Sequence, residues 1–377
     1  MGVATRELPG HDSTSAADEA EMTLVGLLTF YDPPKEGTEQ AIRHLAELGI
    51  STRLITGDNP LAATHIAAQV GLKGATMVGR DIDRLSDSEL ASRVAGTAVF
   101  ADVEPLHKER IVRALHSSGE VVGFLGDGIN DTPGLHAADV GISVDSAVDV
   151  AKQSAAIVLL EKDLAVVAEG VRLGRRTFTN TLKYVRVNTS AAFGNVVSMS
   201  VAAVFLPFLP LLPRQILLLN FLSDVPYTTI STDNADPEQI QRPRAWNVRT
   251  TRNFMLVFGT ISVVFDLVTF LTLRLGFGAD AEVFRTGWFI EFTVTEIAVL
   301  MVLRTNRQFF RSRPGRPLLV TSTALAAVTF ALPYTSLAGP LGLAPLDGAI
   351  IAALAVLTAV YILVNELVKR FFPPDRQ

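Results

Sequence analysis

The pattern of apolar and polar positions changes near residue 183. Before it, short apolar runs alternate with amphipathic segments, and after it long apolar runs dominate. The short runs predict strands, and the amphipathic segments predict helices such as 38–49 and 59–71, the second with Pro60 in its first turn. The expected strands are residues 24–30, 51–56, 97–101, 121–126, 140–144 and 156–160. Alternating strands and helices favour a mostly parallel sheet with helices on both faces.

The apolar half predicts six membrane spans of about 20 residues each, as a bilayer core requires. Their centres lie near Val197, Leu219, Val263, Ala298, Ala326 and Val356. Positive charges gather in alternate connections, which favours a cytoplasmic position for those connections. These residues are Arg242, Arg244, Arg249, Arg252, Arg304, Arg307, Arg311, Arg313, Arg316, Lys369, Arg370 and Arg376. The α/β region and the C-terminus are therefore expected in the cytoplasm, where ATP is found.

Composition supports a membrane protein with a soluble part. The chain has 377 residues, 49% of them hydrophobic, and a mean hydropathy of +0.33. It contains no Cys, so oxygen ligands must hold any metal, and this favours magnesium or calcium over zinc or copper. A net charge of −5 gives no case for nucleic-acid binding. The polar, acidic opening is unlike a cleavable signal peptide.

Two predicted strands end in polar turns. The run VVGFLGDGIND places Asp127 and Asp131 four residues apart after a strand, and STRLITGDN places Thr56, Gly57 and Asp58 after another. In open α/β sheets, ligands bind beyond the carboxyl ends of the strands, so these residues are expected to face one crevice. A hard cation and a phosphate fit such a site. Each motif alone is also an ordinary turn sequence.

Taken in order, TGDN, EPLHK (residues 104–108) and GDGIND (residues 126–131) resemble the phosphorylation domain of P-type ATPases, a branch of the haloacid-dehalogenase fold. DPPKE (residues 32–36), the run from Val140 to Leu164 and the apolar half resemble the bacterial magnesium-importing P-type ATPases in particular. The resemblance extends from about Leu24 to the C-terminus. It implies ATP as substrate, Mg2+ as cofactor and magnesium as the transported ion, in the bacterial plasma membrane.

The same resemblance assigns roles to individual residues. Lys108 would reach the phosphoryl group, Asp127 would bind Mg2+ directly with Asp131 completing the metal site, and Asn130 would donate to the phosphate. Thr56, Gly57 and Asp58 would hold phosphoryl oxygens and position water. Without the flanking motifs, a solvated surface lysine would be the better interpretation of Lys108.

Other expected parts of such a pump do not occur in this sequence. It has no DKTGT motif, whose aspartate is phosphorylated, no TGE-containing actuator domain and no four spans ahead of the α/β region. The chain is therefore expected to be a C-terminal portion. Its expected divisions are the tail of a nucleotide-binding domain or a disordered segment (1–22), a phosphorylation domain (23–162), a stalk helix (163–184) and six transmembrane helices (185–372).

Polar residues inside the predicted spans mark a candidate transport path, because they are costly in lipid. Asn220 and Asp224 lie one turn apart on span two, and Pro226 follows, where it is expected to break the helix and free carbonyl groups. By resemblance, Asn195, Asn220 and Asp224 bind the transported ion. Asn188, Asp266 of span three, and Glu291 and Glu296 of span four are weaker candidates, and hydrogen bonds that only hold the bundle together are the alternative. Glu291 lies near the predicted outer end of its span, where water could hydrate it.

Two classes of function remain open. The first is ATP-driven cation transport, most simply of magnesium, with this chain as the C-terminal part of the catalytic subunit and with a separate N-terminal half and membrane lipids as partners. Calcium or another hard cation is the alternative ion. The second is a non-catalytic remnant or an accessory membrane subunit. A free-standing phosphatase of the dehalogenase type is weaker, because it also needs the missing nucleophilic aspartate.

Overall fold

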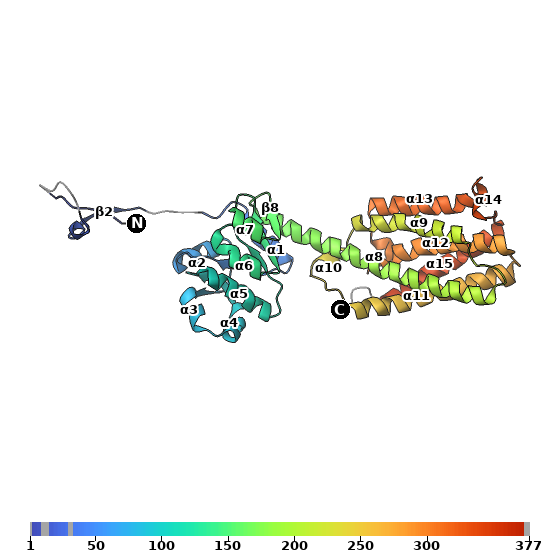
Figure 1. Cartoon of the computed structure of the whole chain (residues 1–377), viewed down its shortest axis with the longest axis horizontal. Coiled ribbons are helices and arrows are strands. Elements are labelled where there is room, and N and C mark those ends of the chain that lie inside the picture. The colour runs from blue at the N-terminus through green and yellow to red at the C-terminus, as the bar shows by residue number, and fades with distance from the viewer. Residues whose placement is uncertain (1, 9–14, 29–32, 373–377) are drawn as a thin grey trace. The chain divides into compact units, whose positions relative to one another are not determined.

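The computed structural model describes residues 2–8, 15–28 and 33–372 (Figure 1). The chain divides into two compact units, Met1–Ala46 with Ile50–Val166, and Glu47–Gly49 with Val167–Gln377. Four sequence-based predictions fall at least partly outside the described residues. They concern the segment 1–22, the end of the predicted strand 24–30, Asp32 of the DPPKE motif and Arg376.

The N-terminal residues form a small antiparallel ribbon of their own. Strand β1 (Gly2–Thr5) pairs with β2 (Thr23–Leu27), and the 3-10 helix η1 (Ala16–Asp18) lies between them in the sequence. The strand predicted from residue 24 therefore forms, but in the described residues it pairs with β1 instead of joining the parallel strands.

The α/β part contains two parallel three-stranded sheets where the sequence predicted one sheet. The first has the order β3 (Leu54–Ile55), β5 (Thr97–Ala101), β4 (Ala75–Val78), and the second has the order β6 (Gly123–Leu125), β7 (Val140–Val144), β8 (Ile157–Leu159). Ile55 of β3 and Phe124 of β6 belong to one hydrophobic cluster, so both sheets share a core. Among the described strands, β3 pairs only with β5 and β6 only with β7.

Seven helices of this unit lie around the strands in the described residues (Figure 1). They are α1 (Thr38–Glu47), α2 (Pro60–Gln69), α3 (Gly79–Arg84), α4 (Asp87–Val94), α5 (Pro105–Ser117), α6 (Thr132–Ala137) and α7 (Asp149–Ser154). Local sequence sets their ends. Asn59 caps α2 through a 2.8 Å bond from the Leu61 N–H, with Pro60 at the first helical position. Gly71, with a φ of 78°, follows the end of α2 in a conformation that favours glycine.

The second unit is helical. Its elements are α8 (Leu164–Phe205), α9 (Pro213–Thr229), η3 (Ile230–Thr232), α10 (Pro237–Ile240), α11 (Val248–Leu271), the π-helical η4 (Thr272–Gly276), α12 (Ala281–Leu303), η5 (Phe309–Arg311), α13 (Arg316–Ala331), η6 (Leu332–Tyr334), α14 (Ala338–Leu341) and α15 (Gly348–Phe371). The predicted stalk and first span form one helix, α8, of 42 residues.

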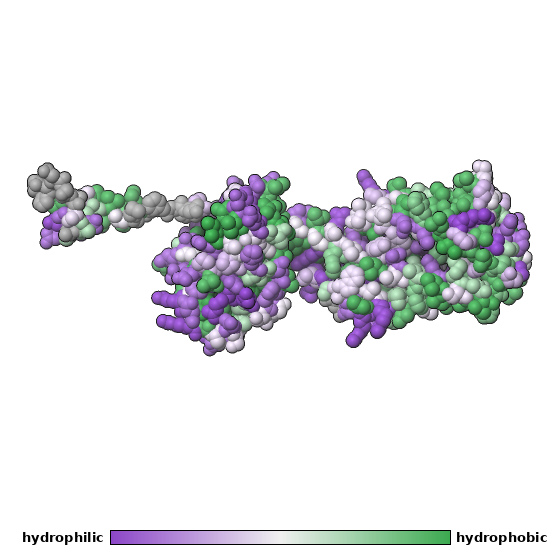
Figure 2. Space-filling view, viewed as in Figure 1, coloured by the Kyte–Doolittle hydropathy of each residue, from purple (hydrophilic) through white to green (hydrophobic). Residues whose placement is uncertain are grey.

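Five helical segments among the described residues are long and apolar enough to cross a membrane. They are α8, α11 with η4, α12, α13 with η6, and α15. The predicted second span is α9, whose 17 residues extend only about 26 Å at the helical rise. A count of six spans is therefore not confirmed. Hydrophobic patches cover much of the visible surface of the bundle (Figure 2). Phe205 and Phe221 are among its exposed apolar side chains.

The prediction that Pro226 breaks its helix is wrong. Pro226 is buried inside α9, which continues to Thr229. Proline lacks an N–H, so the carbonyl of Leu222 still loses its usual helical donor. A single lost hydrogen bond near the last turn does not unwind the helix, and its remaining turns keep their form.

Candidate functional sites

The turn after β3 is held by its own polar groups. The Thr56 hydroxyl donates to Asp58 Oδ2 at 2.7 Å, and the Asp58 N–H donates back to Thr56 Oγ1 at 3.1 Å. Backbone bonds tie the turn to the neighbouring strand end, with the Asp102 N–H donating to the Asp58 carbonyl at 2.9 Å. Gly57 and Asp58 are exposed at the carboxyl end of β3. The turn therefore presents a hydroxyl and a carboxylate in a fixed arrangement.

Asp131 organises the loop after β6. Its Oδ2 atom accepts the N–H groups of Asp127 and Gly128 at 3.1 and 3.0 Å, and its Oδ1 atom accepts Lys108 Nζ at 2.6 Å. Both charged side chains are largely buried, with 12% of Lys108 and 14% of Asp131 exposed. The structure thus brings together two residues that are 23 positions apart, as the sequence predicted for one shared site.

Gly126 is needed at the start of this loop because Asp131 lies against it. A Cβ at position 126 would stand 2.4 Å from the Asp131 Cβ atom, which no side chain could tolerate without movement of the loop. Asn130 is exposed at the tip of the same loop, available to a ligand rather than engaged in the core.

Asp127 has a partner that the sequence analysis missed. Its Oδ2 atom accepts Lys162 Nζ at 2.5 Å, and about half of each side chain is exposed, 50% for Asp127 and 52% for Lys162. Lys162 follows β8 closely, so its position beyond a strand end was the one available signal. A lysine ammonium here occupies a place that a metal cation could take at the same carboxylate.

The donor set fits a magnesium ion at Asp127 better than at Asp131. Magnesium in phosphate-handling sites uses one or two carboxylates and completes its shell with water and substrate oxygens. Asp127 is half exposed and can turn to such an ion. Both oxygens of Asp131 already accept hydrogen bonds. No group of three or more acidic or histidine side chains that could hold a metal is found in the described ranges.

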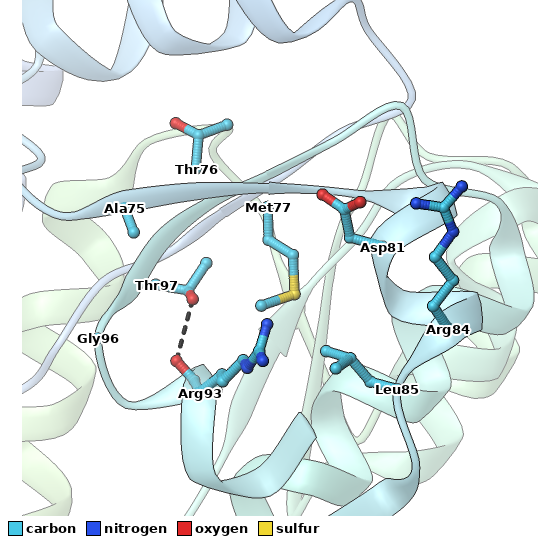
Figure 3. A pocket seen from close by; sticks show the side chains of 9 residues that line it. All are labelled: Ala75, Thr76, Met77, Asp81, Arg84, Leu85, Arg93, Gly96 and Thr97. Carbon is cyan, nitrogen blue, oxygen red and sulfur yellow. Dashed lines mark hydrogen bonds between the residues drawn. The ribbon is translucent and has the colours of Figure 1, made fainter. Parts of the chain in front are cut away.

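A pocket in the same unit lies away from these residues. It is lined by Ala75, Thr76, Met77, Asp81, Arg84, Leu85, Arg93, Gly96 and Thr97 (Figure 3). The Thr97 hydroxyl donates to the Arg93 carbonyl at 3.0 Å, which closes one side of it. None of the predicted site residues contributes to this lining.

In the helical unit, Asn220 and Asp224 are exposed on α9, and Asn195 is half-buried on α8. The described residues show no hydrogen bond that joins these three side chains. Asn188 Nδ2 donates to the Tyr184 hydroxyl at 3.3 Å. Glu296 of α12 has a partner on α9, because Ser223, next to Asp224, donates to its Oε2 atom at 2.6 Å.

Glu291 is not hydrated at an outer helix end, so that expectation is wrong. It lies in the middle of α12 with 1% of its surface exposed. Neighbouring helices cover this face of α12, as the buried neighbours Trp288 and Thr293 also show. Helix packing, which a hydropathy pattern does not reveal, buries the carboxyl group.

A second buried acid was missed altogether. Asp233, in the segment between η3 and α10, is fully buried and pairs with Lys183 of α8 at 2.8 Å and Arg304 at the end of α12 at 3.3 Å. The Gly315 N–H also donates to it at 2.9 Å. One carboxylate therefore joins three separate parts of the bundle.

Comparison with known proteins gives two family matches. Residues 3–139 match a haloacid dehalogenase-like hydrolase model, and residues 208–371 match a model of the cation transporting ATPase C-terminus. The chain is 44% identical over 99% of its length to the magnesium-transporting ATPase, P-type 1, of Escherichia coli K12, and covers 42% of that protein. The chain is a homologue of the P-type cation ATPases. It spans less than half the length of this curated relative.

Other P-type ATPases show the same relationship at two levels of similarity. The magnesium-transporting ATPase, P-type 1, of Salmonella typhimurium strain 14028s is 43% identical over 99% of the chain, which covers 42% of that protein. The calcium-transporting ATPase of Bacillus subtilis is 33% identical over 69% of the chain, which covers 31% of that protein. The haloacid-dehalogenase-like part of the predicted fold is thereby confirmed, together with a helical C-terminal part.

Proposed function

We propose that this chain forms the C-terminal part of a P-type ATPase that moves magnesium across the bacterial plasma membrane with ATP as the energy source. The observation that carries this proposal is the arrangement at the strand ends, where Asp131 holds Lys108 beside the Asp127 loop. The high identity to relatives named as magnesium-transporting supports the choice of ion.

In the proposed site, Lys108 supplies a positive charge to the phosphoryl oxygens, and Asp131 fixes the position of that charge. The Thr56 hydroxyl and the Gly57 backbone hold further oxygens, Asp58 positions water, and Asn130 donates from the loop tip. Asp127 would bind the catalytic Mg2+ directly, and Asp131 would complete the metal site by ordering the loop that carries Asp127. The ion would neutralise charge on the transferred group.

The aspartate that accepts phosphate would lie on a strand from the N-terminal half of the pump. In the described residues β3 and β6 each have one edge without a partner strand, and this supports the proposal, because a strand placed between those edges would join the two three-stranded sheets into one. Ile55 packs against the hydrophobic cluster that contains Phe124, so the two sheets already share one core. The carboxyl end of the added strand would then lie beside Thr56 and Asp127.

The transport path is proposed at Asn195, Asn220 and Asp224, with Asn188 and Glu296 as weaker candidates. Asn220 and Asp224 are exposed on α9 and so are available to helices from the N-terminal half. In this proposal α9 is a sixth span, and the α/β unit and the C-terminus face the cytoplasm. The arginine-rich connections near residues 242–252 and 304–316 support that orientation.

The test is co-expression of this chain with the N-terminal half of a related pump in bacteria that lack magnesium uptake. Growth at low magnesium should require both halves, and Lys108→Ala in this chain should abolish it. Uptake of calcium instead of magnesium would change the proposed ion. Failure of every matched half to restore growth, with both chains inserted in the membrane, would favour a non-catalytic remnant or accessory subunit.

A second measurement addresses the phosphorylated residue. The chain purified alone should form no acid-stable, hydroxylamine-sensitive phosphoenzyme from labelled ATP, whereas the co-expressed halves should form one. A phosphoenzyme on this chain alone would show that its own residues supply the nucleophile, and the proposed strand between β3 and β6 would be wrong.

A further inference from the structure

Two buried carboxyl groups meet inside the helical bundle, and the proposed transport path uses neither of them. Asp266 lies on α11 and Glu291 on α12, with 6% and 1% of their surfaces exposed. Trp288 lies one helical turn before Glu291 on α12 and donates to Asp266 at 2.9 Å, which brings the two acids to the same place, and a side-chain hydrogen bond joins their carboxyl groups. A bond of this kind requires one proton, because two ionised carboxylates have only acceptor atoms.

The donors around the pair show which carboxyl carries the charge. Asp266 Oδ2 accepts the Ser198 hydroxyl of α8 at 2.5 Å, and Asp266 Oδ1 accepts Trp288 Nε1 of α12 at 2.9 Å. With Glu291, three groups converge on Asp266. Two or three donors are what a buried carboxylate needs to remain ionised.

Glu291 has the opposite surroundings. Its Oε2 atom is buried and accepts no hydrogen bond from the residues that the structure describes. An ionised Glu291 would leave a charge without a donor in a low-dielectric interior, at a large cost in free energy. A protonated Glu291 instead donates to Asp266 and leaves only a neutral carbonyl oxygen unpaired.

The described side chains that face the pair are neutral. From α8 comes the neutral Ser198, from α12 the neutral Trp288, and from α15 the hydroxyl of Tyr361, which bonds to Ser262 of α11 at 2.8 Å. In the described part of the chain, no ion pair involves Asp266 or Glu291. Because no basic side chain of the described residues neutralises the two acids, a shared proton is the simplest way to remove one of their two negative charges.

We propose that Asp266 and Glu291 form a proton-binding site that holds one proton between two carboxyl groups. The site is distinct from the contact of Glu296 with Ser223, because Glu291 and Glu296 are five residues apart and project about 140° apart around α12. A proton held inside the bundle could move in the direction opposite to the transported ion. That role rests on the proposed transport function, but the presence of the bound proton does not.

Infrared spectroscopy of the chain in lipid vesicles tests the proton directly. At about pH 7, where an ordinary Glu is ionised, the chain should show a C=O stretching band of a protonated carboxyl group. Glu291→Gln should remove that band. Glu282→Gln, at an exposed position in the first turn of the same helix, is the matched control and should keep it.

Two further variants keep the test decisive if Glu291→Gln does not fold. Asp266→Asn should keep the band but shift its frequency, because an amide replaces the carboxylate acceptor. Trp288→Phe removes one donor to Asp266 and should also shift it. A wild-type chain without the band, or a band unchanged by all three substitutions, would overturn the inference. Loss of the band on addition of magnesium alone would also overturn it, because the pair would then be a metal site.

Discussion

Lys108 on α5 and Asp131 in the loop after β6 form an ion pair of 2.6 Å in which both side chains are largely buried. The pair joins the helix that carries the lysine to the loop that carries Asp127. Because the pair joins the helix to the loop, a change at either residue should alter both the position of the Lys108 charge and the structure of the loop.

We expect Asp131→Asn to retain an acceptor for the loop N–H groups but to leave Lys108 without its counter-charge. In the co-expressed pump, uptake should fall at least tenfold, and the α/β unit should lose about 1 to 3 kcal/mol of stability, as for a charged partner removed from a buried bond. Denaturant unfolding of the chain and magnesium uptake are the measurements. Asp87→Asn, which breaks an exposed pair with Arg110, is the control and should change both little.

Lys162 is expected to compete with magnesium for Asp127. An exposed ion pair contributes up to about 1 kcal/mol, so Lys162→Met should tighten magnesium binding at this loop by up to about fivefold. Asp127→Ala should weaken binding and abolish phosphorylation in the reconstituted pump. Calorimetric titration of the chain with magnesium checks the first effect. Weaker binding in Lys162→Met would mean that the lysine supports the site.

Asp233 should be among the most sensitive positions for folding. Asp233→Ala would leave Lys183 and Arg304 buried without a counter-charge, and such losses cost about 3 to 5 kcal/mol. We expect a large fall in the thermal stability of the detergent-purified chain. Glu238→Ala, which breaks an exposed pair with Arg307, is the matched control. A normal melting temperature for Asp233→Ala would show that water replaces the lost carboxylate.

Asp139 should make the stability of the α/β unit dependent on acid pH. The Val122 N–H, at 2.8 Å, and then His116 hold the pKa of the Asp139 carboxyl below its ordinary value. A lowered pKa stabilises the fold above the ordinary value of about 3.9, and this contribution is lost as the pH falls through the lowered pKa. Asp139→Asn should therefore be less stable than wild type at pH 7, with the difference disappearing in acid. A difference that is constant with pH would exclude this cause.

Asp224→Asn should abolish magnesium uptake by the co-expressed pump while leaving the chain inserted and folded. Asp224 is exposed on α9, so loss of its charge should cost little stability. The measurements are uptake and the melting temperature. Glu296→Gln provides the contrast, because it disturbs a 2.6 Å bond to Ser223. Normal uptake with unchanged magnesium affinity in Asp224→Asn would place the transport site elsewhere.

Local sequence patterns predicted the parts of the structure that depend on neighbouring residues. The GDGIND loop and the helix that begins at Pro105 depend on neighbouring residues only. The order of the motifs along the chain indicated that Lys108 and Asp131 belong to one site, and the two side chains are in contact in the structure. The contact of Lys162 with Asp127 joins residues 35 positions apart, and the burial of Glu291 depends on which face of α12 meets other helices. The periodicity of apolar residues reveals neither contacts between distant residues nor which face of a helix packs against other helices. Strand β4 was missed because its residues, ATMV, form a short and weak signal.

Because α8 is continuous, the rotation between side chains near its start and side chains near its end is fixed. Because 42 residues form one uninterrupted helix, the direction in which Asn195 projects is set by the number of residues that precede it. One inserted alanine near Gly174 would turn every later side chain by about 100°, whereas an insertion of seven residues would restore the angle to within about 20°. The number of residues in α8 therefore sets the rotation at which Asn195 projects, and in the proposed transport path a change in helix length alone would misplace that side chain.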